Sequence, residues 1–300
     1  MRNLFFNDQG QIRSGWRAVT FLCTFLFLSF FFILGSITLI AQLPMGETVT
    51  SYIPLILPFT ISAMLAIVLG WLYGKLFESL PFRVLGISFS GNWLKNLAVG
   101  CLIGAVAIGS AVIVAVMSGG MSLTLNRVSP TSSIATTLLT TLLIFIVGAL
   151  SEETLFRGYL LQTFVRSKHI WVAFGFTSLL FATAHNGNPD ASPLSWLNTF
   201  LAGIWFAAAY MKTRDIWFPL GIHIMWNWLQ GPVFGISVSG ITEFSPDPVL
   251  RATDSGPAWL TGGSYGIEGG IACTIALVIS IGLVYYLPAG IHHRASEDTE

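Results

Sequence analysis

One stretch of the sequence decides the fold class. It runs from residue 134 to residue 165 and reads IATTLLTTLLIFIVGALSEETLFRGYLLQTFV. It is mostly apolar and longer than the roughly 20 residues that a helix needs to cross the hydrocarbon core of a bilayer. Near its end it contains Glu152, Glu153 and Arg157. Because ionisable side chains inside a membrane span are costly, each of the three is a candidate functional residue.

The composition of the whole chain points to the same class. Of 300 residues, 14 are Lys or Arg and 14 are Asp or Glu; charged residues make up 9%, hydrophobic residues 54%, and the mean hydropathy is +0.74. An average soluble domain is about 25% charged, so this composition excludes a soluble protein of this size. It also excludes a disordered or disulfide-stapled chain. The net charge of zero gives no reason to expect a nucleic-acid partner.

Seven further apolar stretches lie on either side of residues 134–165. We therefore predict an all-α polytopic membrane protein with about eight transmembrane helices. We expect one transmembrane helical domain over residues 1–300, with its functional core at about 134–236. The predicted spans are residues 18–41, 52–74, 93–118, 134–165, 170–186, 196–211, 216–236 and 268–289.

The distribution of cations predicts the orientation of these spans. If the N-terminus is cytoplasmic, two cations, Arg127 and Arg251, fall in outer segments, and Arg157 lies within a span. The other eleven fall in inner segments: Arg2, Arg13, Arg17, Lys75, Arg83, Lys95, Arg166, Lys168, Lys212, Arg214 and Arg294. This excess predicts that both termini are inside. We expect a multi-pass protein of the cell membrane, and the short loops favour a bacterial plasma membrane. The longest loop, residues 237–267, is then outside, as a flexible connector or as a substrate lid.

Two further predicted spans carry polar groups. The fifth ends in Phe181-Ala182-Thr183-Ala184-His185, and the seventh contains His223-Ile224-Met225-Trp226-Asn227. Residues four apart share a helix face, so Phe181 lies beside His185, and His223 lies on one face with Asn227. At a rise of 1.5 Å per residue, these groups and the carboxylates of the fourth span are at compatible depths in the membrane.

Helix geometry also makes the two neighbouring carboxylates point in different directions. Glu153 and Arg157 are four residues apart and can form an ion pair. Glu152 is rotated by about 100° from Glu153 around the helix axis. One carboxylate can therefore be neutralised structurally while the other points into a cavity.

Water activation is the chemistry that fits these side chains. A carboxylate in a low-dielectric cavity can take a proton from water, and a neutral imidazole can share that proton or orient the water. A His and an amide on one helix face, here His223 and Asn227, can donate hydrogen bonds to a developing oxyanion. Glu152, His185 and His223 could instead bind one zinc ion with an open position, because two His and one carboxylate form a catalytic zinc set. The residues leave both versions open.

The three patterns together resemble the signature of the CPBP family of intramembrane proteases, which includes the type II CAAX prenyl endopeptidases and bacteriocin-processing or immunity proteins. That signature is EExxxR, then FxxxH, then HxxxN or HxxxD, and it is matched here by residues 152–157, 181–185 and 223–227. The resemblance implies that Glu152 is the catalytic base and His185 its partner. It implies oxyanion stabilisation by His223 and Asn227 and supporting roles for Glu153 and Arg157. The family has been described both as metalloproteases and as metal-free glutamic proteases.

The resemblance implies an endopeptidase that acts on a membrane-associated protein or peptide within the lipid bilayer. One branch of the family implies a prenylated CAAX protein as substrate, and the bacterial-like branch implies a leader or signalling peptide. Two other functions remain open. Buried Glu, His and Arg side chains can form the proton relay of an ion-coupled transporter, although no repeated halves are evident. A non-catalytic membrane scaffold or immunity protein is the third candidate.

Overall fold

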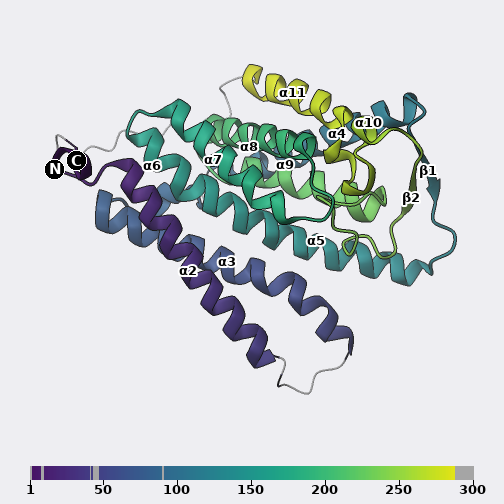
Figure 1. Ribbon diagram of the computed structural model, residues 1–300, viewed down its shortest axis with the longest axis horizontal. Coiled ribbons are helices and arrows are strands. Elements are labelled where there is room, and N and C mark those ends of the chain that lie inside the picture. Colours follow the sequence, from purple (N-terminus) through teal and green to yellow (C-terminus); the bar gives the residue numbers. More distant parts are fainter. Residues whose placement is uncertain (1, 8–9, 41, 43–46, 90, 288–300) are drawn as a thin grey trace. The chain divides into compact units, whose positions relative to one another are not determined.

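The computed structural model describes residues 2–7, 10–40, 42, 47–89 and 91–287, with the backbone alone at residues 2–3 and 47–52 (Figure 1). Arg294, one of the cations counted for the orientation, lies outside the described residues. The chain forms two compact units. Unit 1 comprises Met1–Ile87 and Leu143–Thr177, and unit 2 comprises Ser88–Leu142 and Ser178–Glu300. The expectation of one domain over residues 1–300 stays a prediction.

The elements of unit 1 are almost entirely helical. A 3₁₀ turn, Phe82–Leu85, follows its two longest helices, and a π-helical segment, Thr154–Leu160, joins α5 to α6. The α-helices are α1 (Arg2–Phe5), α2 (Ser14–Ile40), α3 (Glu47–Glu78), the end of α5 (Thr131–Glu153), α6 (Leu161–Arg166) and the start of α7 (Ile170–Ala184).

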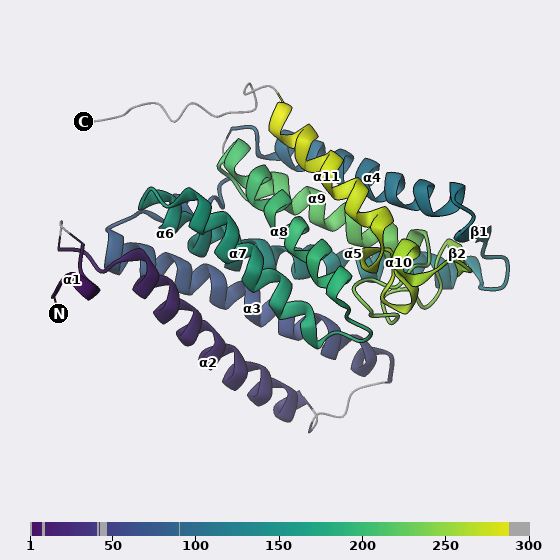
Figure 2. The ribbon, with the colours of Figure 1, turned by 45° about the horizontal axis from the view of Figure 1, so that its top comes forward.

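Unit 2 contains the start of α5, the end of α7 and a second set of helices. A 3₁₀ turn, His185–Gly187, follows α7, and a second π-helical segment, Leu229–Val233, follows α9. The other α-helices are α4 (Trp93–Met117), α8 (Pro193–Thr213), α9 (Trp217–Trp228), α10 (Ala258–Thr261) and α11 (Ile271–Tyr286). Within this unit α11 packs along α8 and α4 (Figure 2).

Five helical segments among the described residues are long and apolar enough to cross a membrane. They are Ser14–Ile40, Ile53–Glu78, Trp93–Met117, Thr131–Arg166 and Pro193–Thr213. These helices confirm the all-α membrane class. The other three predicted spans are also helical but shorter: α7 has 15 residues, α11 has 16, and the 12 residues of α9 continue into the second π-helical segment. The count of eight spans and the orientation stay predictions.

The loop predicted at residues 237–267 is folded. Its strand β2 (Leu250–Asp254) pairs antiparallel with β1 (Met121–Leu125), with Met121 opposite Asp254 and Leu125 opposite Leu250 (Figure 1). Tyr265 is buried at 2% exposure in this segment, and burial, reinforced by the nearby carboxylate of Glu268, raises the pKa of Tyr265 to about 12. A segment with its own buried core does not match a flexible connector; its role as a lid stays a prediction.

Three glycines allow α4 and α9 to pack with their backbones in contact. Gly100 and Gly104, four residues apart on α4, face Phe218 and Ile222 of α9, and Gly221 of α9 faces α4 in return. A Cβ atom at Gly100 would collide with the carbonyl oxygen of Phe218. Small residues four apart are typical of tightly packed membrane helices. The contact positions the part of α9 that carries His223, a candidate site residue, directly after this interface.

Candidate active site

In unit 1, the first motif lies where α5 ends. Nη1 of Arg157 is 3.2 Å from Oε1 of Glu153, and neither side chain has exposed surface. The predicted i,i+4 ion pair is therefore present. Burying two opposite charges together avoids the much larger cost of burying either one without a counter-charge. Glu152, one residue earlier, is half-buried, so the two neighbouring carboxylates differ in environment as the helix geometry predicts.

A π-helical segment, Thr154–Leu160, begins directly after these carboxylates. Such segments are rare and are frequent at functional sites, and their wider hydrogen-bond spacing displaces backbone carbonyls from ordinary helical partners. Here Gln162 of α6 supplies hydrogen bonds to two such carbonyls. Its Nε2 donates to the carbonyl oxygens of Gly158 at 2.6 Å and Arg157 at 3.3 Å. The sequence predicts one regular helix over 134–165, and the π-helical segment is a correction to that prediction.

In unit 2, the second motif positions one imidazole at the end of α7. Nδ1 of His185 lies 2.8 Å from the carbonyl oxygen of Phe181. Because a carbonyl oxygen only accepts, Nδ1 is the nitrogen that carries the proton, and Nε2 of the neutral ring has the lone pair. The ring of His185 also lies against that of Phe181, with 4.8 Å between centroids. The predicted placement of Phe181 beside His185 is therefore confirmed.

The third motif brings a second imidazole to the same aromatic cluster. His223 of α9 is buried, and its ring stacks on Phe206 of α8 with 4.7 Å between centroids. Phe181 lies edge-on to His223 at 6.2 Å and to Phe206 at 5.9 Å. In unit 2, the rings of His185 and His223 thus both lie next to the ring of Phe181. The helices α8 and α7 approach each other closely at Gly203 and Ser178. A Cβ atom added at Gly203 would lie 2.8 Å from Cα of Ser178.

Asn227 lies one turn beyond His223 on α9 and is half-buried. The preceding residue ties this turn to the segment before α11, since Nε1 of Trp226 donates to Oε1 of Glu268 at 3.1 Å. Oε2 of Glu268 accepts from the backbone N–H of Ser239 at 2.6 Å and from its hydroxyl at 2.9 Å. Sequence reasoning did not identify Glu268, because it lies in a glycine-rich segment at the start of a predicted span.

The six predicted site residues divide between the units. Glu152, Glu153 and Arg157 belong to unit 1, and His185, His223 and Asn227 belong to unit 2. Within either unit, the described residues include no group of three or more His, Cys, Asp or Glu side chains suited to hold a metal ion. The proposed zinc set, Glu152 with the two His, draws on both units, so neither unit by itself fits zinc, and zinc binding stays a prediction.

Comparison with known proteins identifies the segment that carries the motifs. Residues 134–229 match the family model described as type II CAAX prenyl endopeptidase Rce1-like. The chain is also 35% identical over 140 residues to an "Uncharacterized 24.3 kDa protein" of Escherichia coli, a match that covers 44% of this chain and 62% of the relative. The matched part thus spans less than two thirds of that relative. No solved structure matches the chain.

The matched range contains all three motifs, residues 152–157, 181–185 and 223–227. It also contains Phe206, the ring on which His223 stacks. Residues 134–229 of the chain are thus similar to the Rce1-like type II CAAX prenyl endopeptidases, in agreement with the CPBP family that its motifs resemble.

Proposed function

We propose that this protein is an intramembrane endopeptidase that hydrolyses a peptide bond of a membrane-associated protein or peptide. The observation that carries the proposal is the Rce1-like match over residues 134–229, which includes Glu152, His185, His223 and Asn227. The five long apolar helices support a site within the bilayer. The substrate class is part of the proposal, and prenylated and unprenylated substrates are distinguished by the experiment below.

In the proposed reaction, the carboxylate of Glu152 takes a proton from a water molecule, and the water oxygen attacks the scissile carbonyl carbon. His185 orients that water. Its Nδ1–H donates to the Phe181 carbonyl, so its Nε2 is the nitrogen that can accept a hydrogen bond from the water. The buried ion pair of Glu153 with Arg157 supports this step, because it neutralises the neighbouring carboxylate and leaves Glu152 as the base.

The attack converts the carbonyl oxygen into an oxyanion. His223 and Asn227 donate hydrogen bonds to that oxygen, as a pair of donors on one helix face can. The protonated Glu152 then gives its proton to the amide nitrogen, the C–N bond breaks, and an amine and a carboxyl product leave. Stacking of His223 on Phe206 fits this role because it restricts the orientation of the ring before substrate binds.

The deciding experiment compares wild-type protein with Glu152→Gln in lipid nanodiscs. Membrane peptides and synthetic prenylated and unprenylated peptides are added, and cleavage products are identified by mass spectrometry. Glu152→Gln should lose cleavage and remain folded. Glu243→Gln, which changes an exposed carboxylate of the loop at residues 237–267, is the matched control and should cleave normally. Full activity of Glu152→Gln would overturn the proposal.

Two other outcomes would replace the protease assignment. Proton-coupled uptake into proteoliposomes that Glu152→Gln abolishes, without any cleavage, would assign a transporter. A cellular phenotype that Glu152→Gln leaves unchanged would assign a scaffold or immunity role.

The zinc version of the same site is tested separately by metal analysis. Zinc is measured in purified wild-type protein and in His223→Ala, together with peptide cleavage. One zinc per chain that disappears in His223→Ala would support binding by Glu152, His185 and His223. A wild-type preparation that is active without metal would eliminate the zinc version and retain the glutamic one.

A further inference from the structure

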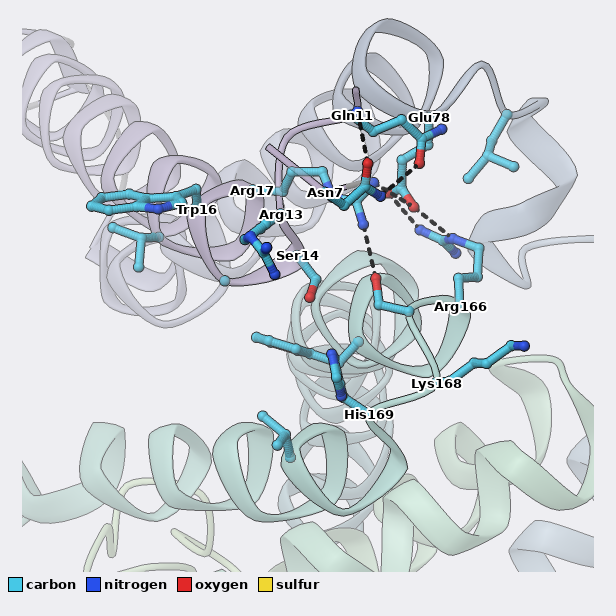
Figure 3. A pocket seen from close by; sticks show the side chains of 16 residues that line it. Asn7, Gln11, Arg13, Ser14, Trp16, Arg17, Glu78, Arg166, Lys168 and His169 are labelled. Atoms are coloured by element: carbon cyan, nitrogen blue, oxygen red, sulfur yellow. Dashed lines mark hydrogen bonds and ion pairs between the residues drawn. The ribbon is translucent and has the colours of Figure 1, made fainter. Parts of the chain in front are cut away.

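Unit 1 contains a large cavity that none of the three motifs lines. Its volume is about 990 Å³, and it lies where the segment before α2, the end of α3 and the turn between α6 and α7 meet (Figure 3). Ligand pockets in proteins typically measure about 300–1,000 Å³. The cavity is therefore large enough for the headgroup of a lipid or for a comparable small molecule.

The described residues that line this cavity carry an excess of positive charge. Arg13, Arg17, Arg166 and Lys168 contribute four cations, and Glu78 contributes one carboxylate, which leaves a formal charge of +3. We call the space lined by these five residues the basic cavity. Arg13 and Lys168 are exposed, whereas Arg17 is buried at 4% exposure. The cations therefore range from the open side of the cavity to its buried floor.

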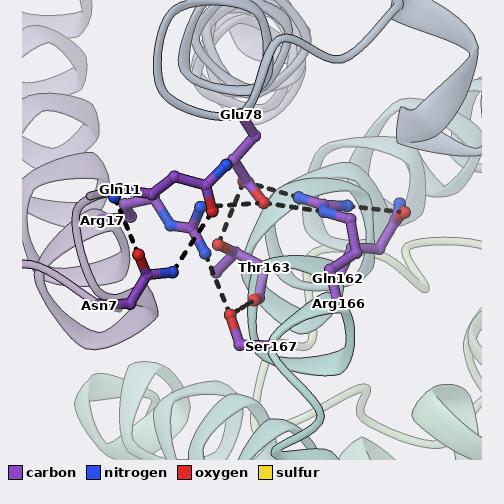
Figure 4. A network of polar contacts seen from close by, with 8 residues as sticks. All are labelled: Asn7, Gln11, Arg17, Glu78, Gln162, Thr163, Arg166 and Ser167. Carbon is purple, nitrogen blue, oxygen red and sulfur yellow. Dashed lines mark hydrogen bonds and ion pairs between the residues drawn. The ribbon is translucent and has the colours of Figure 1, made fainter. Parts of the chain in front are cut away.

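Glu78 forms the floor by holding two guanidinium groups at once (Figure 4). Arg166 binds it through two hydrogen bonds, Nε to Oε2 at 2.9 Å and Nη2 to Oε1 at 2.8 Å. Nη1 of Arg17 lies 3.2 Å from Oε2 of the same carboxylate. One carboxylate balances only one of the two guanidinium charges, so the floor itself keeps a positive charge.

One donor of the floor has no acceptor in the part of the chain that the structure describes. Nη2 of Arg17 donates to the hydroxyl of Ser167 at 3.1 Å, but its Nε is buried and has no hydrogen-bond partner among the described residues. A buried donor without an acceptor destabilises the folded state. An anionic ligand in the cavity would supply negative charge to this positively charged floor and hydrogen-bond acceptors to the exposed Arg13 and Lys168.

Among the other residues that line the basic cavity are apolar side chains that lead to membrane-spanning surface. Trp16 (Figure 3) and Val19 line it from the first turns of α2. Phe164 and Val172 line it from α6 and α7. Further along α2, Phe27 and other large apolar side chains are exposed, as expected of a lipid-facing helix. Trp at the end of a span is typical of the headgroup level of a bilayer. The cations thus lie next to a surface that acyl chains can follow.

We propose that the basic cavity binds the phosphate-bearing headgroup of an anionic phospholipid, with the acyl chains along the exposed face of α2. The positive-inside bias predicts that this end of α2 is cytoplasmic, where basic pockets between spans are suited to such headgroups. Arg13 and Lys168 attract the headgroup, and Arg17 with Arg166 faces its phosphate oxygens. A soluble phosphate ion has the same headgroup chemistry without the chains, and the experiment separates the two sources.

The test measures lipid retention by native mass spectrometry on the full chain. Wild-type protein, the double variant Arg13→Gln/Lys168→Asn and the control Lys75→Gln are purified with phosphatidylglycerol or with phosphatidylcholine of the same acyl chains. Asn is chosen at Lys168 because that residue has φ of +62°, which Asn tolerates. Lys75 is an exposed cation on α3 that does not line the cavity.

We expect wild-type protein to retain phosphatidylglycerol in preference to phosphatidylcholine. A Lys or Arg near an anionic lipid surface contributes about fivefold in affinity, so the double variant should retain phosphatidylglycerol about 25-fold less. Lys75→Gln should match wild type. Equal retention by wild type and double variant, or equal retention of the two lipids, would overturn the proposal.

A second arm adds inorganic phosphate, with chloride at equal ionic strength as its control. Phosphate should neither displace phosphatidylglycerol nor raise the thermal stability of the delipidated protein as much as that lipid does. If phosphate alone stabilises the wild-type protein and the double variant loses this effect, the ligand is a soluble anion and the lipid proposal is overturned. Because retention is measured without substrate, the result does not depend on the proposed protease activity.

Discussion

The imidazole of His223 lies flat on the ring of Phe206, with 17° between the ring planes. The two residues come from neighbouring helices, α9 and α8, and both belong to unit 2. A flat stack of this kind limits rotation of the imidazole about its side-chain torsions. Phe206 therefore acts on the proposed reaction through His223, as a positioning residue.

Phe206→Leu keeps most of the apolar volume and removes the flat surface. We expect kcat for peptide cleavage to fall about tenfold with little change in KM, because a misoriented donor costs transition-state stabilisation and not ground-state binding. Steady-state cleavage in nanodiscs measures both constants. Phe200→Leu on the same helix, whose ring stacks on Trp196 at 5.9 Å, is the control. Equal losses in the two variants would contradict a positioning role.

The buried ion pair of Glu153 with Arg157 predicts an asymmetric response to substitution. Arg157→Met leaves a buried carboxylate without its counter-charge and should cost about 3–5 kcal/mol in the free energy of unfolding. The double variant Glu153→Gln/Arg157→Met removes both charges and should recover part of that loss. Unfolding in mixed detergent micelles measures the difference. A double variant no more stable than Arg157→Met would show that the pairing is not the main contribution.

The contact between α4 and α9 predicts different effects for two glycines of the same helix. Gly104→Ala would place a Cβ atom 2.9 Å from Cα of Ile222, so α9 must shift; overpacking of this kind costs about 1–3 kcal/mol. The shift should also lower cleavage, since His223 is the next residue. Gly109→Ala, with no atom within 4 Å of the added methyl, should fold normally. Thermal unfolding and peptide cleavage are measured for both variants. Equal stability and equal cleavage in the two would contradict the packing argument.

Asp215 predicts a pH-dependent stability that a single substitution removes. Burial raises the pKa of Asp215, and hydrogen bonds from Asn96, Thr213 and the backbone N–H groups of Trp217 and Phe218 limit the rise. The folded state therefore holds the proton of Asp215 to a higher pH than the unfolded state does. The protonated carboxyl contributes to the free energy of unfolding in full below the ordinary pKa of 3.8, and this contribution is lost as pH rises through the pKa of the folded state.

Asp215→Asn should therefore flatten the decline of unfolding free energy over that pH range. Unfolding of wild type and variant at a series of pH values measures the two slopes. Asp190→Asn, which changes an exposed carboxylate, should keep the wild-type slope. An unchanged slope in Asp215→Asn would show that other groups set it.

The hydrogen bonds of Glu268 predict how firmly the loop at residues 237–267 is held to α9. Ser239→Ala removes the hydroxyl donor at 2.9 Å and retains the backbone hydrogen bond. A hydrogen bond to a charged group contributes about 1.5–3 kcal/mol, so amide exchange around residues 237–241 should accelerate about tenfold or more through local opening. Exchange measured by mass spectrometry tests this, with the exposed Ser264→Ala as control. Unaltered exchange in Ser239→Ala would mean that the loop is held elsewhere.

The long apolar runs made the helices predictable. Hydropathy located α2 and α4 to within about four residues, and the spacing of four predicted the ion pair of Glu153 with Arg157. Hydropathy did not reveal the π-helical segment Thr154–Leu160, because a change in hydrogen-bond spacing leaves the apolar pattern intact. The roles of Glu152, His185, His223 and Asn227 rest on the family motifs and stay predictions.

Features that depend on tertiary contacts were not predictable from local patterns. Glu268 lies 42 residues from Trp226, and only the fold brings its carboxylate to that indole. The cations of the basic cavity were counted for orientation alone, since nothing local shows that Arg17 and Arg166 share Glu78. The pairing of β1 with β2 was missed because only apolar runs long enough to be spans were considered.

The π-helical segment Thr154–Leu160 has a consequence for the angular register of its helix. Each residue of an α-helix turns the chain by about 100°, and a π-helical turn accommodates one residue more than an α-helical turn. Deleting one residue within Thr154–Leu160 would let the segment form a regular α-helix. The rotation of α6 about the helix axis would then follow from α5 at the ordinary rotation of about 100° per residue. Glu152 would keep its direction, whereas the side chains of α6 would point in other directions relative to Glu152 than they do now. Arg166 would then lose its bidentate hold on Glu78. The extra residue therefore sets the phase between the carboxylate motif and the basic end of the same helix.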